Sequence, residues 1–156
     1  MNTPEKALFD LLLEKNKTLA AAESCTGGLI AKRMTDLPGA SKVFRGGVVS
    51  YWSEVKASVL GVDQDLLDAY GAVSEPVARA MAEGVRTLTG ADIAVSVTGV
   101  AGPDADERGN AVGTVFIAAA EEDRTVCCRF NFGALCREEI RSLSADAAFI
   151  LAQDIL

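Results

Sequence analysis

Histidine is absent from the 156-residue chain, and this absence excludes more chemistry than any other feature of its composition. Ser-His-Asp and Cys-His catalysis both need an imidazole, and so do zinc sites that contain histidine. Any general base must therefore be a lysine, a carboxylate, a tyrosine, a thiolate or water.

Long apolar runs and basic clusters are also missing. No run of about 18 apolar residues occurs, so we expect no membrane-spanning helix and no membrane partner. Segment 1–17 lacks the basic start, the long apolar stretch and the small-residue cleavage site of a signal peptide, which predicts a cytoplasmic protein. The net charge of −7 argues against nucleic acid as the main partner, because phosphate binding depends on lysine and arginine.

The cysteines include no Cys-x-x-Cys pair. They are Cys25, Cys127, Cys128 and Cys136. We therefore expect buried free thiols, with neither a disulfide framework nor a four-thiolate metal site. We also expect no other metal site and no cofactor. Cys127 and Cys128 are adjacent in a predicted strand, so their side chains should point to opposite faces.

The apolar content of 49% and the small number of prolines, 4, predict one globular domain over 1–156. Helical spacing predicts helices over 3–15, from 29 to before Pro38, and over 52–60, 65–70, 74–90 and 137–155. Strands are predicted over 18–22, 44–51, 93–97, 113–120 and 125–132, the last two forming a hairpin. This order predicts an α/β fold, a three-layer α/β/α sandwich with a mixed, largely parallel sheet.

Local details are also predicted. Ser74 should cap the fifth helix, and a glycine pair, Gly46-Gly47, should weaken its strand or mark a bulge. In the fifth helix the predicted buried stripe is Val77, Met81, Val85 and Leu88. In the last helix the residues predicted to face the core are Ile140, Leu143, Ala147, Ile150 and Leu151.

The stretch 20–30, AAAESCTGGLI, reads as a small-residue strand, a tight turn and the start of a helix. Ser24, Cys25 and Thr26 place a hydroxyl, a thiol and a hydroxyl at this junction. Gly27 and Gly28 let backbone amides approach a ligand, and the first amides of a helix are free to hold an oxyanion. The alternative is that Ser24 or Thr26 simply caps the helix.

Without histidine, lysine is the base that could activate Ser24, as in Ser-Lys variants of the triad. An ordinary lysine has a pKa of ~10.4, and burial can lower this to roughly 7–8. Lys56 is the candidate, and its predicted helix contains the apolar residues Trp52, Val55, Val59 and Leu60. Tyr51 could bridge Ser24 and Lys56 or polarise the substrate. The alternative is a surface lysine and a tyrosine that closes the core.

A second glycine-rich turn, Thr98 with 99–102, follows a predicted buried strand. Ligands in such folds bind beyond the carboxyl ends of strands, where both turns fall. The alternative is an ordinary turn, because a Gly-x-x-Gly pattern has low specificity. Candidate basic groups for a phosphate are Arg137 and Arg141, one helical turn apart, with Lys42 and Arg45.

These segments, in this order, resemble the CinA C-terminal domain family over nearly the whole chain. They are 22–28 (AESCTGG), 46–51 (GGVVSY) with Lys56, 71–74 (GAVS), 98–103 (TGVAGP) and 112–115 (VGTV). The resemblance implies a nicotinamide-nucleotide amidohydrolase, which converts nicotinamide mononucleotide (NMN) to nicotinate mononucleotide and ammonia without a metal. It also implies a homodimer or higher homo-oligomer.

The resemblance further implies the roles of individual residues. Ser24 resembles the nucleophile, Lys56 the general base, and Tyr51 the tyrosine that completes the site. The implied substrate-binding residues are Cys25, Thr26, Gly27, Gly28, Gly47, Thr98, Gly99, Ala101, Gly102 and Arg137.

Two segments depart from the family pattern. Residues 104–111 (DADERGNA) replace a glycine run and Lys-Pro-Val-Gly, and 133–137 keeps the arginine of Gly-Asp-Arg but loses the aspartate. The phosphate and ribose contacts, and with them the substrate, therefore stay open. Two alternatives remain: an amidase that uses Cys25 with Glu23 or Lys56 as base, and a non-catalytic nucleotide-binding or interaction module of the same fold.

Overall fold

The computed structural model describes residues 2–156, and five strands form its sheet in the order β2-β1-β3-β4-β5. The strands are β1 (Leu19–Glu23), β2 (Phe44–Val49), β3 (Ile93–Gly99), β4 (Thr114–Ala120) and β5 (Thr125–Asn131). β1 pairs in parallel with β2 and β3, whereas β4 is antiparallel to both β3 and β5. Only β4 therefore runs against the other strands, and the predicted mixed, largely parallel sheet is confirmed.

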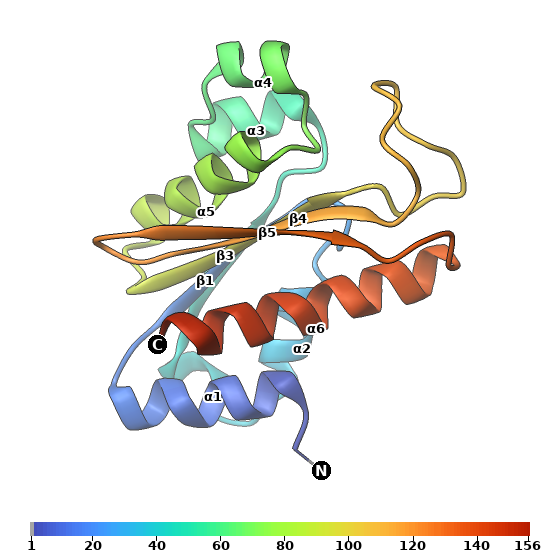
Figure 1. Cartoon of the computed structure of the whole chain (residues 1–156). Coiled ribbons are helices and arrows are strands. Elements are labelled where there is room, and N and C mark those ends of the chain that lie inside the picture. The colour runs from blue at the N-terminus through green and yellow to red at the C-terminus, as the bar shows by residue number, and fades with distance from the viewer. Residues whose placement is uncertain (1) are drawn as a thin grey trace.

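Helices cover both faces of the sheet, which confirms the three-layer sandwich (Figure 1). They are α1 (Pro4–Lys15), α2 (Leu29–Thr35), α3 (Ser53–Leu60), α4 (Gln64–Tyr70), α5 (Glu75–Thr89) and α6 (Arg137–Ile155), with a 3-10 turn η1 (Ala40–Lys42). α1, α2 and α6 lie on one face; on the other, α5 packs on the sheet, and α3 and α4 pack on α5. No helix in residues 2–156 is long and apolar enough to cross a membrane.

The sheet separates two apolar cores. Leu12, Met34 and Phe149 are buried between the sheet and the layer of α1, α2 and α6, while Met81 is buried between the sheet and α5. β1 lies between two strands and two helical layers, so all five of its residues are buried. Its alanines leave little side-chain volume to accommodate, so the helices can approach this strand closely.

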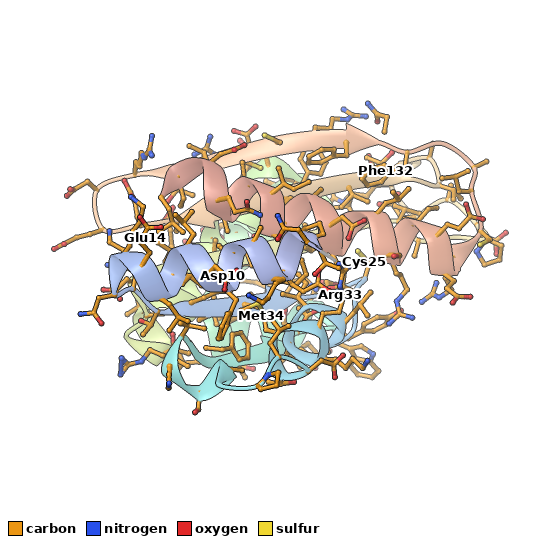
Figure 2. The ribbon with its side chains drawn as sticks, turned by 90° about the horizontal axis from the view of Figure 1, so that it is seen from below. Asp10, Glu14, Cys25, Arg33, Met34 and Phe132 are labelled. Carbon is orange, nitrogen blue, oxygen red and sulfur yellow. The ribbon has the colours of Figure 1, made fainter. Side chains whose placement is uncertain are left out.

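An ion-pair cluster joins the three helices of one face. The guanidinium of Arg33 on α2 contacts Glu5 at 2.6 Å and Asp146 of α6 at 2.7 Å, and its side chain is 16% exposed. Figure 2 shows Arg33 between α1 and α6. These contacts hold α2, and therefore the turn that precedes it, against the rest of the layer.

Three predictions about helix faces are wrong. Leu88 is 56% exposed and lines an open groove between α3 and α5. Leu143 and Ile150 of α6 are also exposed. The side of α6 that faces the core carries Ser144 and several alanines instead, and these small residues let the helix lie close to the sheet.

The predicted bulge in β2 is confirmed. Leu19 pairs with Phe44 but the next residue, Ala20, pairs with Gly46, so Arg45 is extra on β2. Gly46 has a φ of 150°, which a residue with a side chain rarely adopts.

The cap predicted for α5 has a different role. Ser74 occupies the N-cap position of α5, but its hydroxyl donates to the carbonyl of Gly71 and does not accept a hydrogen bond from a helix amide.

The cysteines are all free thiols, as predicted, but only Cys25 is buried. Cys127 is half-buried against the cluster beneath α5, and the adjacent Cys128 is exposed, in line with side chains on opposite faces of β5. Cys136 is exposed at the start of α6. The prediction of buried thiols is therefore wrong for the exposed pair, because β5 is an edge strand and α6 begins at the surface.

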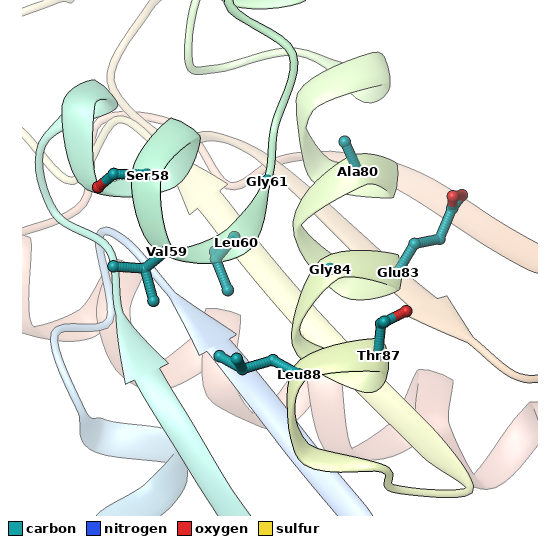
Figure 3. A pocket seen from close by; sticks show the side chains of 9 residues that line it. All are labelled: Ser58, Val59, Leu60, Gly61, Ala80, Glu83, Gly84, Thr87 and Leu88. Atoms are coloured by element: carbon teal, nitrogen blue, oxygen red, sulfur yellow. The ribbon is translucent and has the colours of Figure 1, made fainter.

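The contact between α3 and α5 depends on Gly84. A Cβ on Gly84 would lie 2.0 Å from the carbonyl oxygen of Leu60. Figure 3 shows Gly84 and Leu60 in the groove between the two helices. Leu60 follows Lys56 by one helical turn, so this close approach also sets the position of Lys56.

We predict that Gly84→Ala destabilises the fold by about 1–3 kcal/mol, although alanine favours a helix more than glycine does. The added methyl group would push α3 away from α5. Urea unfolding measures the effect, and Glu83→Ala, at an exposed position of the same helix, is the control. A Gly84→Ala protein as stable as the control would show that the contact with Leu60 does not hold α3 in place.

Candidate active site

Ser24 lies in the turn that leaves β1, at the carboxyl end of the parallel strands. Its backbone amide donates to the carbonyl of Val97 on β3 at 2.9 Å. The turn then continues through Gly27 and Gly28, which have φ values of 57° and 103°. Both values lie in the left-handed region that favours glycine, so the chain can reverse sharply into α2.

Glu23, and not Ser24 or Thr26, caps α2. Its carboxylate accepts hydrogen bonds from the amides of Ile30 and Ala31 at 2.9 and 3.1 Å, and the residue is 1% exposed. The N-cap residue itself is Gly28, which has no side chain to serve as a cap. The capping alternative for Ser24 and Thr26 is therefore wrong, and the Ser24 hydroxyl is available for another role.

Lys56 is the group that contacts Ser24. Its Nζ lies 2.9 Å from Oγ of Ser24, and it donates to the carbonyl oxygens of Ser50 and Tyr51. Lys56 is 0% exposed and shares the buried side of α3 with Leu60, so it is not a surface lysine.

The burial of Lys56 does not come from all the residues predicted to surround it. Trp52 and Val59 are exposed. Instead, the side chain of Lys56 extends from α3 to the ends of β1 and β2, where it contacts Ser24, Ser50 and Tyr51.

Burial lowers the pKa of Lys56 from 10.5 to about 8. At pH 7 about one molecule in ten then carries the neutral amine, whereas an unperturbed lysine is neutral to only about 0.04%. No carboxylate forms an ion pair with Lys56 in residues 2–156, and the charge interaction with Cys25 offsets only part of the effect of desolvation on the pKa.

The neighbours of Nζ also suit the neutral form. The carbonyl oxygens of Ser50 and Tyr51 can only accept hydrogen bonds, and a neutral amine has two N–H bonds to give them. Its lone pair then faces the hydroxyl of Ser24, which can donate. This arrangement can move a proton from Oγ to Nζ.

Cys25, next to Ser24, is placed differently. Its side chain packs in the apolar cluster between the sheet and α6, and burial raises the pKa of the thiol to about 12. Because the thiolate is the nucleophilic form, burial disfavours reaction of this thiol at neutral pH. Arg141 of α6 donates to the carbonyls of Cys25 and Thr26, so it fixes the turn, and it does not line the cavity beside Ser24.

Several groups of the turn lack hydrogen-bond partners. Among the residues that the structure describes, the backbone amides of Cys25, Thr26 and Gly28 donate to no protein acceptor. The buried hydroxyl of Thr26 also has no partner in this part of the chain. Backbone amides beside a nucleophile can stabilise a developing oxyanion.

A cavity of about 280 Å³ lies beside Ser24. It is lined by Ser24, Cys25, Tyr51, Gly99, Val100, Ala101, Gly102, Asp104, Asp106 and Arg137. The structure therefore brings both predicted glycine-rich turns to one site. Val100 belongs to the predicted 99–102 turn, whereas Asp104 and Asp106 were not predicted; for these aspartates, the signal in the sequence was the departure of 104–111 from the family pattern.

Other predicted site residues lie outside this cavity lining. The Thr98 hydroxyl donates to the carbonyl of Ala72 at 2.8 Å, and a Cβ on Gly47 would lie 2.9 Å from a backbone oxygen of β1. We assign both a structural role. Thr26, Gly27, Gly28 and Lys56 lie behind the lining, and neither Lys42 nor Arg45 reaches it.

Tyr51 and Arg137 form the outer wall of the cavity. Arg137 donates to the Tyr51 hydroxyl at 2.9 Å and to the carbonyl of Gly102 at 2.6 Å. The Tyr51 hydroxyl therefore does not bridge Ser24 and Lys56, which touch directly, and its predicted role in polarising the substrate stays a prediction.

Comparison with known proteins identifies the family of this chain. The sequence model of the CinA C-terminal domain matches residues 1–156. This chain belongs to the CinA C-terminal domain family.

Relatives and solved structures agree with this assignment. A protein of Desulforudis audaxviator named for competence-damage induction is 53% identical over 126 residues, which are 81% of this chain and 30% of that protein. A CinA-like protein of Thermotoga neapolitana is 48% identical over 141 residues, 90% of this chain and 34% of that protein. The chain thus spans about a third of the length of these relatives.

The fold matches crystal structures of CinA-type proteins. The competence/damage inducible protein CihA from Agrobacterium tumefaciens superposes with a TM-score of 0.94 at 32% identity, covering 97% of this chain and 93% of that one. A CinA superfamily protein from Escherichia coli also gives a TM-score of 0.94, at 31% identity, over 99% of this chain and 91% of that one.

The depressed pKa of Lys56 predicts a specific pH dependence of stability. Between pH 8 and 10.5 the unfolded chain binds a proton at this lysine that the folded protein lacks, so raising the pH favours folding. Wild-type protein should gain up to about 3 kcal/mol relative to Lys56→Met across this window. Urea unfolding at several pH values measures the difference. A difference independent of pH would show that the lysine is not desolvated.

Proposed function

We propose that this domain is an amidohydrolase in which Ser24 is the nucleophile and Lys56 the general base. The expected substrate is NMN, whose carboxamide would be hydrolysed to nicotinate mononucleotide and ammonia, as in pyridine nucleotide salvage. The observation that carries the proposal is the 2.9 Å contact between a fully buried lysine amine and the Ser24 hydroxyl, beside a cavity.

The reaction proceeds by acyl transfer in two steps. Neutral Lys56 accepts the proton of the Ser24 hydroxyl as Oγ attacks the carboxamide carbon. The free amides of the turn hold the oxyanion, each contributing roughly 3–4 kcal/mol. Lys56 returns the proton to the leaving nitrogen, and ammonia departs. Water then gives Lys56 a proton and attacks the acyl-enzyme. As the ester bond breaks, Lys56 passes this proton to Oγ, which restores Ser24 and the neutral amine and releases the acid product.

Tyr51 and Arg137 have a positioning role in this scheme. Because Arg137 links Tyr51 to the 99–102 turn, the two side chains keep the cavity wall beside Ser24 in place. The chemistry uses only protein groups and water. Assembly as a homodimer, a cytoplasmic location and the lack of a nucleic-acid partner stay predictions.

Substitution at the Ser24–Lys56 pair should abolish the reaction. We expect Ser24→Ala and Lys56→Met to lower ammonia release from NMN by at least about 10³-fold, because the steps they remove cannot be supplied by the oxyanion site alone. Circular dichroism controls for folding. Cys25→Ala is the matched variant, because it changes the neighbouring residue and the alternative nucleophile, and it should keep most of the activity.

Two results would contradict the assignment. Near-normal turnover by Ser24→Ala, combined with loss in Cys25→Ala, would transfer the nucleophile to the thiol. Binding of NMN by the wild-type protein with no ammonia from any pyridine carboxamide would favour a non-catalytic nucleotide-binding module.

The pH profile tests the base. Because only neutral Lys56 can accept the Ser24 proton, kcat/KM should rise about tenfold per pH unit below pH 8 and level off above it. Steady-state ammonia assays from pH 6 to 10 measure the inflection. A profile that is flat across this range would exclude a titrating lysine as the base in the free enzyme.

A further inference from the structure

The 104–111 loop, part of the connection between β3 and β4, borders the cavity beside Ser24. It contributes Asp104 and Asp106 to the lining of this cavity. Figure 1 shows that the connection projects from the end of the sheet. The loop is also the segment that departs from the family pattern, so the resemblance gives its residues no role. What holds this loop beside the cavity must be found in its own contacts.

The tip of the loop is closed on itself by Asp106. The Asp106 carboxylate accepts hydrogen bonds from the amides of Arg108 and Asn110 and from the Asn110 side chain. The Asp106 amide donates to the carbonyl of Asn110, and the Gly109 amide donates to the carbonyl of Asp106. Segment 106–110 is therefore one compact turn, and its place relative to the cavity depends on contacts made by the outside of this turn.

Arg108 joins this turn to α4. Its guanidinium donates to the carbonyls of Asp68 at 2.6 Å and Ala69 at 3.2 Å. Both carbonyls lie in the last turn of α4, where backbone oxygens have no acceptor role left within the helix. In residues 2–156, the other hydrogen bond from the 104–111 loop to the rest of the chain is at its base, where Ala111 accepts from the Thr114 amide. Arg108 therefore makes the hydrogen bonds that fix the tip.

The contact of Arg108 with α4 needs a glycine. Gly71 follows α4 with a φ of 78°, and a Cβ on it would lie 2.5 Å from Cδ of Arg108 and 2.6 Å from its Nε. The arginine thus packs directly on the glycine backbone. The next carbonyl, that of Ala72, accepts from the Thr98 hydroxyl at 2.8 Å, and Thr98 leads into the 99–102 turn. The link after α4 therefore holds the connection between β3 and β4 at its root and at its tip.

We propose that Arg108 is a positioning residue that fastens the 104–111 loop to α4 and so keeps this side of the cavity closed around a substrate. The proposal rests on the proposed amidohydrolase function and adds how its site retains a substrate. Arg108 lies outside the cavity lining and acts through the loop that contributes to it. Because Arg108 is exposed and its acceptors are neutral carbonyls, the loop can open to admit a substrate and release a product.

Two variants release this contact from opposite sides. Arg108→Met keeps an aliphatic side chain but removes the N–H groups, whereas Gly71→Ala keeps the arginine and displaces it from α4. Arg108→Lys retains a cationic donor. Arg86→Met is the matched control, because Arg86 also donates to a backbone carbonyl, that of Asp92, and lies outside the cavity lining.

Opening of the loop can be measured without catalysis. Endoproteinase Glu-C cleaves after glutamate, and Glu107 is exposed in the loop and kept in every variant. When the loop opens and closes faster than it is cut, the cleavage rate follows the population of the open form. Mass spectrometry assigns the cleavage to the bond after Glu107. Ammonia release from NMN gives kcat and KM separately, and urea unfolding reports the stability of the whole fold.

We expect Arg108→Met and Gly71→Ala each to raise cleavage after Glu107, and KM for NMN, by about three- to tenfold, the shift that the loss of a hydrogen bond gives. Arg108→Lys should recover part of this loss, and saturating NMN should slow the cleavage. The double variant should be no more open than Arg108→Met alone, because both changes remove one contact.

Other measured values should stay as in the wild-type protein. The kcat value and the inflection of the pH profile should change little, because Ser24 and Lys56 lie on β1's turn and α3, to which the loop makes no hydrogen bond. Arg86→Met should change neither the cleavage rate nor KM.

Several results would overturn the proposal. Unchanged cleavage in Arg108→Met would show that the arginine does not hold the loop, and raised cleavage with an unchanged KM would show that the loop does not retain the substrate. Additive effects in the double variant would show that Gly71→Ala acts through strain and not through Arg108. No ammonia from the wild-type protein would reject the proposed function, while cleavage with and without NMN still decides whether Arg108 closes the loop on a ligand.

Discussion

An amine held out of water beside a hydroxyl is the interaction on which the site depends. Lys56 has no exposed surface, and its Nζ meets two carbonyl oxygens and the Ser24 hydroxyl. The chain has no histidine, and desolvation lowers the pKa of this lysine so that part of it is neutral, and can accept a proton, near physiological pH. The same burial raises the pKa of Cys25, because it disfavours the thiolate just as it disfavours the ammonium ion. One physical effect thus shifts both pKa values in the direction that favours the neutral amine and the neutral thiol.

The sheet supplies the geometry that this contact needs. β1 and β3 are parallel and in register, so the turns that follow Glu23 and Gly99 emerge together. β2 lies on the other side of β1, and Ser50 just beyond its end hydrogen-bonds through its amide to the carbonyl of Glu23. The carbonyl of Ser50 then accepts a hydrogen bond from Lys56, which also contacts Ser24, so this contact is tied to the ends of β1 and β2. The carboxylate of Glu23, buried behind the turn, satisfies two amides of α2 and leaves those nearer Ser24 without protein acceptors.

Much of this arrangement could be predicted from the sequence, and the failures have physical causes. Apolar periodicity located the helices and strands, and the glycine-rich turns located the cavity. Leu88 lines the open groove between α3 and α5, and its exposure depends on this tertiary packing, which spacing along one helix does not contain. The cap of α2 comes from a strand residue seven positions before the amide it binds, whereas local rules favour Ser24 or Thr26. The burial of Lys56 depends on the close approach of α3 to α5 at Gly84, a tertiary contact without a local signature.

The buried lysine also sets a requirement on the rest of the molecule. Below its folded-state pKa, Lys56 favours the unfolded chain, where water solvates the ammonium ion, so the site works against the fold near neutral pH. The surroundings of the site must therefore be held by interactions that do not involve the lysine itself. Arg33 joins three helices behind the turn, Arg141 binds two of the turn's carbonyls, and Arg137 fastens the outer wall. Each of these arginines is bound to groups of the fold, so all three help to hold the scaffold around the site.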